Sequence, residues 1–278
     1  MGMDNTMQKS KTAMTVRRTE RLAEGVYSLL LQDPQGRFPK GVRPGQFVGV
    51  YPKDASALLP RPISVCDFDA ERGELLLVYR VAGKGTREFS ALQAGDSVDV
   101  LGMLGNGYDV GALTGKRVLL LGGGIGAPPM LGLARALYRA NQAAGIENPE
   151  SMVTAVMGYR SSDLFLTEEF RAVCHLLIAT DDGTVGFHGN AVEAARTAAS
   201  SCDAICACGP LPMLRSVKAL AQEKQVMCRI SLEERMACGV GACLGCVVKT
   251  AGIDGHSHVN NARICTEGPV FAAEDVEI

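Results

Sequence analysis

The feature that most constrains this chain is the spacing of four cysteines near its C-terminus. They follow the pattern C-x4-C-x2-C-x18-C and are Cys238, Cys243, Cys246 and Cys265. This spacing is typical of a [2Fe–2S] cluster, in which three thiolates on one loop and a distant fourth surround two irons. Gly239, Gly241 and Gly245 separate the first three cysteines, and we expect them to supply the positive φ values that such a loop needs. Zinc is the alternative, but structural zinc sites usually combine two C-x2-4-C pairs, and only one such pair is present. The sequence therefore predicts a chain that carries single electrons.

Composition narrows the class of protein. The chain has 278 residues, enough for about two domains with a sizeable core. Its formal net charge of −2 gives no reason to expect nucleic acid or an acidic membrane surface as a partner. Although there are ten cysteines, residues 1–18 lack an apolar signal segment, so a disulfide framework is not expected. The longest uncharged stretch, residues 118–134, is too short and too rich in glycine to cross a membrane. We expect a soluble, cytoplasmic protein without a membrane span.

The predicted fold class is multi-domain, β plus α/β. Residues 1–12 are expected to form a flexible N-terminus, and residues 13–112, with short apolar runs between turn signals, an antiparallel β-barrel. Residues 113–229 alternate apolar runs with helical segments, which predicts a parallel α/β nucleotide-binding domain. Residues 230–278 are too short to build a core alone, so a cluster is expected to stabilise this small third domain. Predicted strands are 25–31, 46–50, 63–66, 74–81, 97–103, 117–121, 152–157, 175–179, 204–207 and 225–229, and predicted helices are 130–144, 191–199 and 213–224.

Two segments of the barrel region have the chemistry of a phosphate site. Arg61-Pro62-Ile63-Ser64 begins an apolar strand; an arginine fork suits a pyrophosphate, and a serine hydroxyl can hydrogen-bond a ring nitrogen. Val78-Tyr79-Arg80 precedes Gly83-Lys84-Gly85-Thr86, a turn that can present backbone N–H groups and a hydroxyl to phosphate. Taken separately, an ordinary strand start and a capped hairpin turn explain these segments more simply.

The α/β region opens with a glycine-rich turn after an apolar strand. Within Gly122-Gly123-Gly124-Ile125-Gly126-Ala127, the residues Gly122, Gly124 and Ala127 fit the pattern G-x-G-x-x-A that lets backbone approach a pyrophosphate. Pro128 and Pro129 suit the first turn of the following helix. The acidic residue that usually ends the second strand is missing. Arg160 there favours a 2′-phosphate and Asp163 argues against one, so the choice between NADH and NADPH stays open.

The remaining cysteines divide into one candidate and several packing residues. Cys208-Gly209 ends a predicted strand, and Cys208 therefore lies where parallel sheets bind ligands, a position from which it can face a nicotinamide ring. Most free cysteines are buried small apolar residues, and this explanation is preferred for Cys66, Cys174, Cys202, Cys206 and Cys228. His256 and His258 are interpreted as loop residues, because four cysteines already complete a cluster.

In this order the motifs resemble the ferredoxin–NADP reductase superfamily. With the four-cysteine segment, the chain from about Ala13 to its end resembles the family of electron transfer subunits of class B dihydroorotate dehydrogenase. The resemblance implies FAD in the barrel, NAD(H) in the α/β domain and a [2Fe–2S] cluster in the tail. It implies that Arg61 binds the FAD pyrophosphate, that Ser64 lies near the reactive flavin nitrogen, and that Gly85 and Thr86 bind phosphate. The implied cofactor-binding residues are Arg61, Pro62, Ile63, Ser64, Val78, Tyr79, Arg80, Gly85, Thr86, Gly122, Gly123, Gly124, Gly126, Cys208 and Gly209, with Ser64 and Cys208 as catalytic residues.

Two departures from the wider superfamily accompany this resemblance. Ile63 stands where many members have an aromatic residue against the flavin, and the terminal aromatic residue of plant-type reductases is missing, since the chain continues into the cysteine segment. The resemblance further implies a catalytic dihydroorotate dehydrogenase subunit as partner, in a heterotetramer of two plus two. The small subunit of a sulfide dehydrogenase or of an electron-bifurcating NAD(P)H:ferredoxin oxidoreductase is the alternative enzyme. A zinc-stabilised binding module without redox activity is the alternative of another class.

Overall fold

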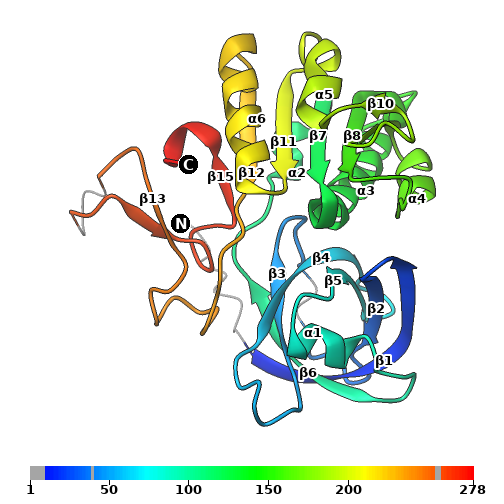
Figure 1. Ribbon diagram of the computed structural model, residues 1–278, viewed down its shortest axis with the longest axis vertical. Helices are drawn as coiled ribbons and strands as arrows, with labels where there is room; N and C mark the ends of the chain where they lie inside the picture. Colours follow the sequence, from blue (N-terminus) through cyan, green and yellow to red (C-terminus); the bar gives the residue numbers. More distant parts are fainter. Residues whose placement is uncertain (1–9, 39–40, 254–257) are drawn as a thin grey trace.

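The computed structural model describes residues 10–38, 41–253 and 258–278. A β-barrel and an α/β layer lie one against the other, and a cysteine-bearing segment packs at the side of the α/β layer (Figure 1). The search for membrane-spanning helices, confined to these residues, found none of sufficient length and apolarity.

The barrel is closed by six antiparallel strands in the order β1-β2-β5-β4-β3-β6. Its interior is filled by alternate side chains such as Leu29, Leu77 and Val100, as the two-residue period of a strand requires. A short helix, α1, lies between β5 and β6 and buries Phe89 in the same core. The elements are β1 (Ser10–Ala23), β2 (Val26–Gln32), β3 (Phe47–Tyr51), β4 (Arg61–Asp69), β5 (Glu74–Arg80), α1 (Lys84–Phe89) and β6 (Ser97–Leu104).

The prediction of a flexible N-terminus through residue 12 is wrong for its last residues. Ser10, Lys11 and Thr12 belong to β1, where they pair with Gly102, Leu101 and Val100 of β6. Thr12 is buried, because β1 runs along the barrel for 14 residues and closes it against β6. Residues 1–9 of that predicted terminus lie outside the described residues.

The α/β layer is a seven-stranded sheet in the order β10-β9-β8-β7-β11-β12-β15. All neighbouring strands are parallel except the pair β12–β15. Helix α3 packs on the face toward the barrel, and α5 and α6 pack on the other face. The elements are α2 (Val110–Leu113), β7 (Val118–Gly123), η1 (Gly124–Gly126), α3 (Ala127–Ala143), η2 (Pro149–Met152), β8 (Val153–Tyr159), α4 (Thr167–Arg171), β9 (His175–Thr180), β10 (Phe187–His188), α5 (Ala191–Ala199), β11 (Ala204–Cys208), α6 (Leu211–Lys224) and β12 (Met227–Ser231).

The barrel is fastened to the α/β layer by specific contacts. Arg135 of α3 forms a half-buried ion pair with Asp67 of β4, at 2.6 Å between Nη1 and Oδ2. Tyr108, buried after β6, donates its hydroxyl hydrogen to the carbonyl of Ala207 in β11 at 3.1 Å. These two contacts join the barrel and the loop after it to α3 and β11 of the α/β layer.

The cysteine-bearing domain starts slightly later than the predicted residue 230, and it is joined to the sheet at both ends. β12 continues to Ser231, and β15 (Val270–Ala272) pairs with it, so the segment leaves the sheet and returns to it. Between them lies a two-stranded ribbon of β13 (Val247–Lys249) and β14 (Asn261–Arg263), and η3 (Ala273–Asp275) follows β15. Cys246 and Cys265 share one apolar core with the sheet, which explains how so short a segment becomes ordered.

Candidate functional site

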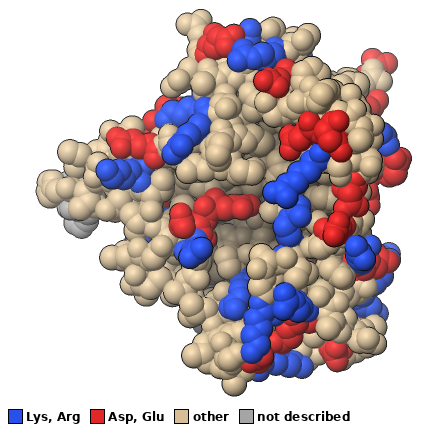
Figure 2. Space-filling model, viewed as in Figure 1, with Lys and Arg blue, Asp and Glu red and all other residues tan. Residues whose placement is uncertain are grey.

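A cavity of about 370 Å³ lies between the barrel and the α/β layer. Figure 2 shows the surface hollowed between these two parts, with acidic and basic side chains along the rims. The cavity is lined by Phe47, Arg61, Pro62, Ile63, Ser64, Val78, Tyr79, Arg80, Ala82, Thr86, Ile125, Ser231, Leu232, Glu233, Glu234, Met236 and Pro269. It thus brings together both predicted barrel segments, the glycine-rich turn and the chain that follows β12.

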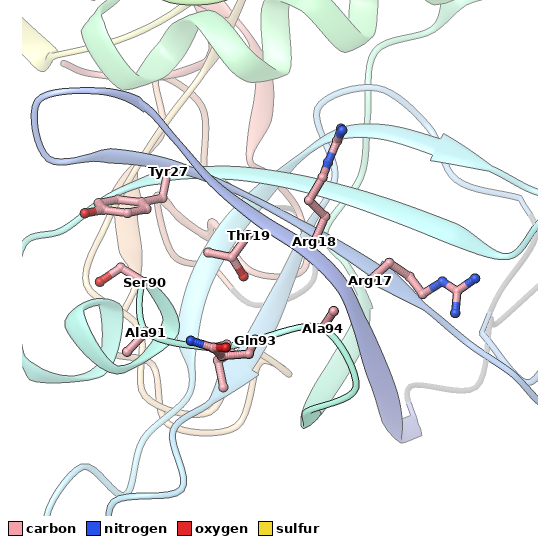
Figure 3. Close-up of a pocket in the computed structure, with 9 residues that line it drawn as sticks. Arg17, Arg18, Thr19, Tyr27, Ser90, Ala91, Gln93 and Ala94 are labelled. Atoms are coloured by element: carbon pink, nitrogen blue, oxygen red, sulfur yellow. The ribbon is translucent and has the colours of Figure 1, made fainter.

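A second hollow at one end of the barrel has a different character. It is lined by residues of β1, by Tyr27 and by the chain after α1. In Figure 3 the side chains of Arg17 and Arg18 extend in different directions, so their charges do not converge on a common point. None of the predicted cofactor-binding residues lies there. We therefore place the candidate site in the cavity between the two parts of the molecule.

The two barrel segments meet at Gly85. A Cβ added to Gly85 would lie 2.8 Å from both Nε of Arg61 and Cγ of Pro52, so only glycine lets the Arg61 guanidinium approach α1 this closely. Arg61 also donates a hydrogen bond to the carbonyl of Leu59. Thr86 Oγ1 accepts hydrogen bonds from the backbone N–H groups of Ala82 at 2.9 Å and Gly83 at 3.1 Å. The result is a fixed turn beside a held arginine, the donor arrangement that suits a pyrophosphate.

The residues predicted to lie along a flavin ring differ in burial. Ile63 and Val78 are buried, and Ser64 is half-buried in β4. The ring of Tyr79 packs in the barrel core, stacked on Tyr27 with 6.4 Å between ring centroids and edge-on to Phe89 at 6.1 Å. Its hydroxyl is buried and has no hydrogen-bond partner among the residues that the structure describes. This part of the wall is apolar with few polar atoms, which fits a large planar group such as isoalloxazine.

The glycine-rich turn packs tightly against the end of β11. A Cβ on Gly126 would overlap the carbonyl of Cys208, and one on Gly123 would lie 2.7 Å from Sδ of Met213. Gly124 has a φ of 53° and is the open member of the turn, with Nη2 of Arg80 3.9 Å from where its Cβ would be. Pro128 and Pro129 fall in the first turn of α3, as the sequence predicts. Gly123 and Gly126 thus allow close packing against the neighbouring elements, whereas Gly124 stays accessible.

Asp163 has a role that sequence reasoning did not anticipate. Its Oδ2 accepts a hydrogen bond of 2.7 Å from the backbone N–H of Glu24 in the β1–β2 turn, 139 residues away in the chain. Asp163 therefore joins the α/β layer to the barrel, and its presence says little about the 2′ position of a nucleotide. A different acidic residue, Asp181, follows β9, and its backbone N–H donates to the carbonyl of Tyr159 at 3.1 Å. This contact places Asp181 directly beside the end of β8.

Glu233 is the cavity residue that sequence reasoning missed. It lies two residues past the end of β12, and its Oε1 accepts from the Cys208 thiol at an Sγ–O distance of 3.9 Å. Part of the side chain is open to the cavity, but burial of the carboxyl still raises its pKa, against the lowering effect of the Cys208 hydrogen bond. Burial also raises the pKa of Cys208 well above the usual range, so this thiol is neutral. Glu233 could have been found from the parallel pairing of β11 with β12, because this pairing places the ends of both strands at the same edge of the sheet.

The four cysteines of the C-terminal segment form two pairs. The Cys243 side chain lowers the pKa of the Cys238 thiol, and the Cys246 side chain raises that of the Cys265 thiol, so the members of each pair lie near each other. Cys243 is exposed and Cys238 half-buried, whereas Cys246 and Cys265 are 2% and 1% exposed. Among the described residues, no His, Cys, Asp and Glu side chains form a group of three suited to a single metal ion. Two separate thiol pairs fit a binuclear cluster, with two ligands for each iron, better than one tetrahedral zinc.

The cysteine loop already stabilises thiolate. Burial alone would raise the pKa of Cys238, but the backbone N–H groups of Val240 and Cys243, each 3.4 Å from Sγ, bring it down to about 6. Gly239 and Gly241 have positive φ values of 69° and 88°, as predicted. The prediction is wrong for Gly245, since the third positive φ, 57°, belongs to Leu244. His258 is exposed, and His256 lies outside the described residues.

The other cysteines occupy packing positions. Cys66, Cys174, Cys206 and Cys228 are buried, and Cys202 is half-buried. Burial raises the thiol pKa of the four buried residues and of Cys202, so none is a reactive thiolate at neutral pH. Their interpretation as small apolar residues agrees with this burial.

The fold and the site define a flavoprotein of the ferredoxin–NADP reductase type, extended by an iron–sulfur segment. Its antiparallel barrel carries a turn suited to a pyrophosphate and is joined to a parallel nucleotide-binding sheet. A solved structure of an NADH-dependent reduced ferredoxin–NADP oxidoreductase matches 98% of this chain and 91% of its own chain, with 28% identity and a TM-score of 0.78. A ferredoxin reductase of carbazole 1,9a-dioxygenase, 21% identical with a TM-score of 0.65, shares the fold over 80% of this chain and 68% of its own.

Sequence comparison narrows the class. Residues 233–277 match the iron–sulfur cluster binding domain of dihydroorotate dehydrogenase B. The dihydroorotate dehydrogenase B (NAD(+)) electron transfer subunit of Listeria innocua is 39% identical over 270 residues, covering 96% of this chain and 99% of the relative. That of Bacillus caldolyticus is 40% identical over 267 residues, covering 95% and 97%. The chain belongs to the family of dihydroorotate dehydrogenase B electron transfer subunits.

Proposed function

We propose that this chain takes electrons released by dihydroorotate oxidation in a partner flavoprotein subunit and delivers them to NAD+, a step of pyrimidine biosynthesis. The observation that carries the proposal is the full-length similarity to electron transfer subunits, together with a cysteine segment and a flavin-sized cavity in one chain. When bound, FAD accepts one or two electrons and a [2Fe–2S] cluster accepts one, so these groups supply the change from single-electron to hydride chemistry.

The barrel residues are proposed to hold FAD. Arg61, with Gly85 and Thr86, binds the pyrophosphate, because the guanidinium and the α1 turn are fixed against each other. Pro62, Ile63, Ser64, Val78, Tyr79 and Arg80 form the wall that would face the flavin ring. The apolar residues of this wall exclude water from the ring.

The α/β residues are proposed to hold NAD(H). Gly122, Gly123, Gly124 and Gly126 form the turn for the pyrophosphate, and Cys208 with Gly209 forms the wall beside it. Ser64 and Glu233 both line the cavity, and the buried Cys208 thiol donates to the Glu233 carboxylate at 3.9 Å from behind the cavity wall. Glu233 holds a proton on its carboxyl at a higher pH than an exposed glutamate does, because burial raises its pKa.

The preference for NAD(H) over NADP(H) is proposed to depend on Asp181. An acidic side chain can hydrogen-bond a ribose 2′-hydroxyl and repels a 2′-phosphate. Asp163 is engaged by Glu24, and Asp182 accepts hydrogen bonds from Thr184 N–H at 3.0 Å and its hydroxyl at 2.7 Å. Asp181 is exposed at the end of β9, next to the end of β8. It therefore supplies, from the neighbouring strand, the acidic group that β8 lacks.

The cysteine segment is proposed to hold the cluster and to dock the partner. Cys238 and Cys243 would bind the outer iron, and Cys246 and Cys265 the inner one, following their pairing and burial. Val240, Leu244 and Val247 are 39%, 62% and 37% exposed around the outer cysteines, an apolar surface suited to a subunit contact. We propose a heterotetramer of two such chains and two catalytic subunits, located in the cytoplasm.

One alternative shares the scaffold. The structural neighbour with 98% coverage is a reduced ferredoxin–NADP oxidoreductase, so a small subunit of an electron-bifurcating enzyme has the same fold. Its identity of 28% is lower than the 39% shared with the Listeria innocua subunit, which favours the dihydroorotate assignment.

The test is a pull-down of the tagged chain from its native host under anaerobic conditions. Dihydroorotate and NAD+ are added to the eluate, and NADH formation is followed. We expect NADH, together with a second flavoprotein chain in the eluate. A coloured eluate that NADH reduces, yet that dihydroorotate leaves unchanged, would refute the substrate assignment and favour the bifurcating alternative.

A further inference from the structure

Arg263 lies beside the two buried cysteines. It ends β14, pairs with Val247 of β13, and is followed by Ile264, whose N–H donates to the Cys246 carbonyl at 2.9 Å. Cys265 comes two residues later in the chain. The guanidinium turns back over the loop between the first two cysteines, where Nη1 donates to the carbonyl of Gly241 at 3.4 Å. One side chain thus connects the loop of the outer pair to the strand that precedes the inner cysteine.

Glu267 holds the guanidinium in this position. Its carboxylate receives Arg263 Nη2 at 2.6 Å, Nε at 3.0 and 3.2 Å, and the Arg263 backbone N–H at 2.7 Å. Thr266 adds a hydroxyl hydrogen bond of 2.9 Å to the same carboxylate. A carboxylate with this many donors holds both charges still, unlike an ordinary surface ion pair. Glu267, which follows β14 in the chain, therefore fixes the position of the Arg263 guanidinium.

Gly241 is the residue that this arrangement confines. A Cβ there would lie 2.9 Å from Cγ2 of Thr266 and 3.6 Å from Nη1 of Arg263. Its φ of 88° is a conformation that other residues rarely adopt. The loop between Cys238 and Cys243 is thus held from one side by Arg263 and Thr266, and its N–H groups are aimed at Cys238 from the other.

We propose that Arg263 and Glu267 form a charge pair that positions the cysteine loop, and that each charge of the pair offsets the effect of the other on the reduction potential of the cluster that the loop would hold. This inference rests on the proposed cysteine ligands. Reduction adds one negative charge to the cluster. A nearby positive charge favours the reduced form and a nearby negative charge opposes it, and bringing them together as a pair makes their opposing effects nearly cancel.

The sign of each substitution follows from this balance. Arg263→Gln leaves the Glu267 charge uncompensated and lowers the potential, whereas Glu267→Gln leaves the Arg263 charge uncompensated and raises it. The double variant falls between them, near the unmodified protein. For a partly exposed unit charge we expect each single change to alter the ratio of reduced to oxidised cluster about tenfold at a fixed potential, which corresponds to 59 mV for one electron.

The experiment is a redox titration of the full-chain holoprotein, monitored by the electron paramagnetic resonance signal of the reduced cluster, with iron and sulfide measured in every sample. Arg196→Gln is the matched control, because it breaks an exposed ion pair with Glu223 between α5 and α6, away from the cysteines. The control is expected to leave the potential unchanged. Opposite shifts in the two single variants support the proposal.

Other results distinguish the role of the charge pair from the assignment of the cysteine ligands. Normal iron content with unchanged potentials, or with shifts of the same sign, overturns the role of the charge pair and leaves the cysteine ligands standing. Absence of iron and sulfide from the unmodified protein overturns the ligand assignment and the inference with it. If Arg263→Gln fails to retain the cluster, Arg263→Lys must restore it at a potential near the original, and failure to do so refutes the role of the positive charge.

Discussion

Gly85→Ala tests whether the contact between Arg61 and α1 forms the FAD pyrophosphate site. The added Cβ would lie 2.8 Å from Nε of Arg61 and from Cγ of Pro52, well inside the 3.5–4.0 Å at which such atoms are in optimal contact. The Pro52 ring cannot rotate away, so the guanidinium must move. A displaced guanidinium loses one charge-assisted hydrogen bond to phosphate, worth about 1.5–3 kcal/mol. The dissociation constant of FAD is therefore expected to rise about 10- to 100-fold.

Stability of the FAD-free protein distinguishes this effect from simple misfolding. Overpacking costs about 1–3 kcal/mol, but alanine is better than glycine inside a helix by about 0.5–1 kcal/mol. We therefore expect the free energy of unfolding to fall by no more than about 2.5 kcal/mol, the largest difference between these two effects. The FAD-free protein is titrated with FAD by flavin fluorescence and unfolded in urea. Gly41→Ala is the control, because its Cβ would meet no atom of the described residues within 4 Å. A normal FAD affinity in a normally folded Gly85→Ala protein would refute the reasoning.

Three further outcomes are expected. Cys243→Ala should abolish the bound iron and electron flow from the partner, while NADH oxidation with an artificial acceptor continues; loss of bound FAD as well would contradict the separation of the two sites. Burial raises the pKa of Glu233 above 4.5, so between 4.5 and the raised pKa the folded protein holds this proton while the unfolded chain releases it, and stability falls as pH rises through this range. Glu233→Gln should remove this pH dependence of the free energy of unfolding, measured by urea titration at several pH values. An unchanged pH dependence would mean that another group causes it. Asp181→Asn should lower the ratio of KM for NADPH to KM for NADH about tenfold, a difference of about 1.4 kcal/mol. Asp182→Asn should leave this ratio unchanged, because the Asp182 carboxylate is hydrogen-bonded within its own turn. Equal effects of the two variants would contradict the special role of Asp181.

The parts of the site that could be predicted from sequence are those in which neighbouring residues carry the chemistry. The four cysteines, the glycine-rich turn and the two barrel segments can each be recognised from a short stretch of sequence. The long strand β1 was not predicted, because residues such as Arg17, Arg18 and Glu20 interrupt its alternation where it passes the barrel surface. Its pattern is readable only once β6 and β2 are known to lie on either side.

Residues whose partners lie far along the chain were missed or misread. Glu233 gains its meaning from Cys208 on the neighbouring parallel strand, and Asp163 from Glu24 in another domain. Leu244 rather than Gly245 takes the positive φ in the cysteine loop, although glycine adopts that conformation at lower cost. For Glu233 and Asp163 a tertiary contact, absent from the local pattern, decides the residue's role, whereas nothing in the structure explains the φ of Leu244.

The return of the chain through β15 has a consequence for how such a protein can be assembled. Ser231 and Val270 are paired neighbours in one sheet, and the Leu232 N–H donates to the Pro269 carbonyl at 2.9 Å, so the cysteine segment is an insertion with a closed neck. Closing the neck with a short linker costs little loop entropy and keeps the barrel and the strand order of the sheet, although Met236 would be lost from the cavity wall and Cys246 and Cys265 from the shared core. The electron-carrying segment is thus an insertion into a reductase whose two nucleotide-binding parts are formed by the rest of the chain. A chain shortened between Glu234 and Gly268 should fold as a two-cofactor flavoprotein that oxidises NADH but no longer exchanges electrons with its partner.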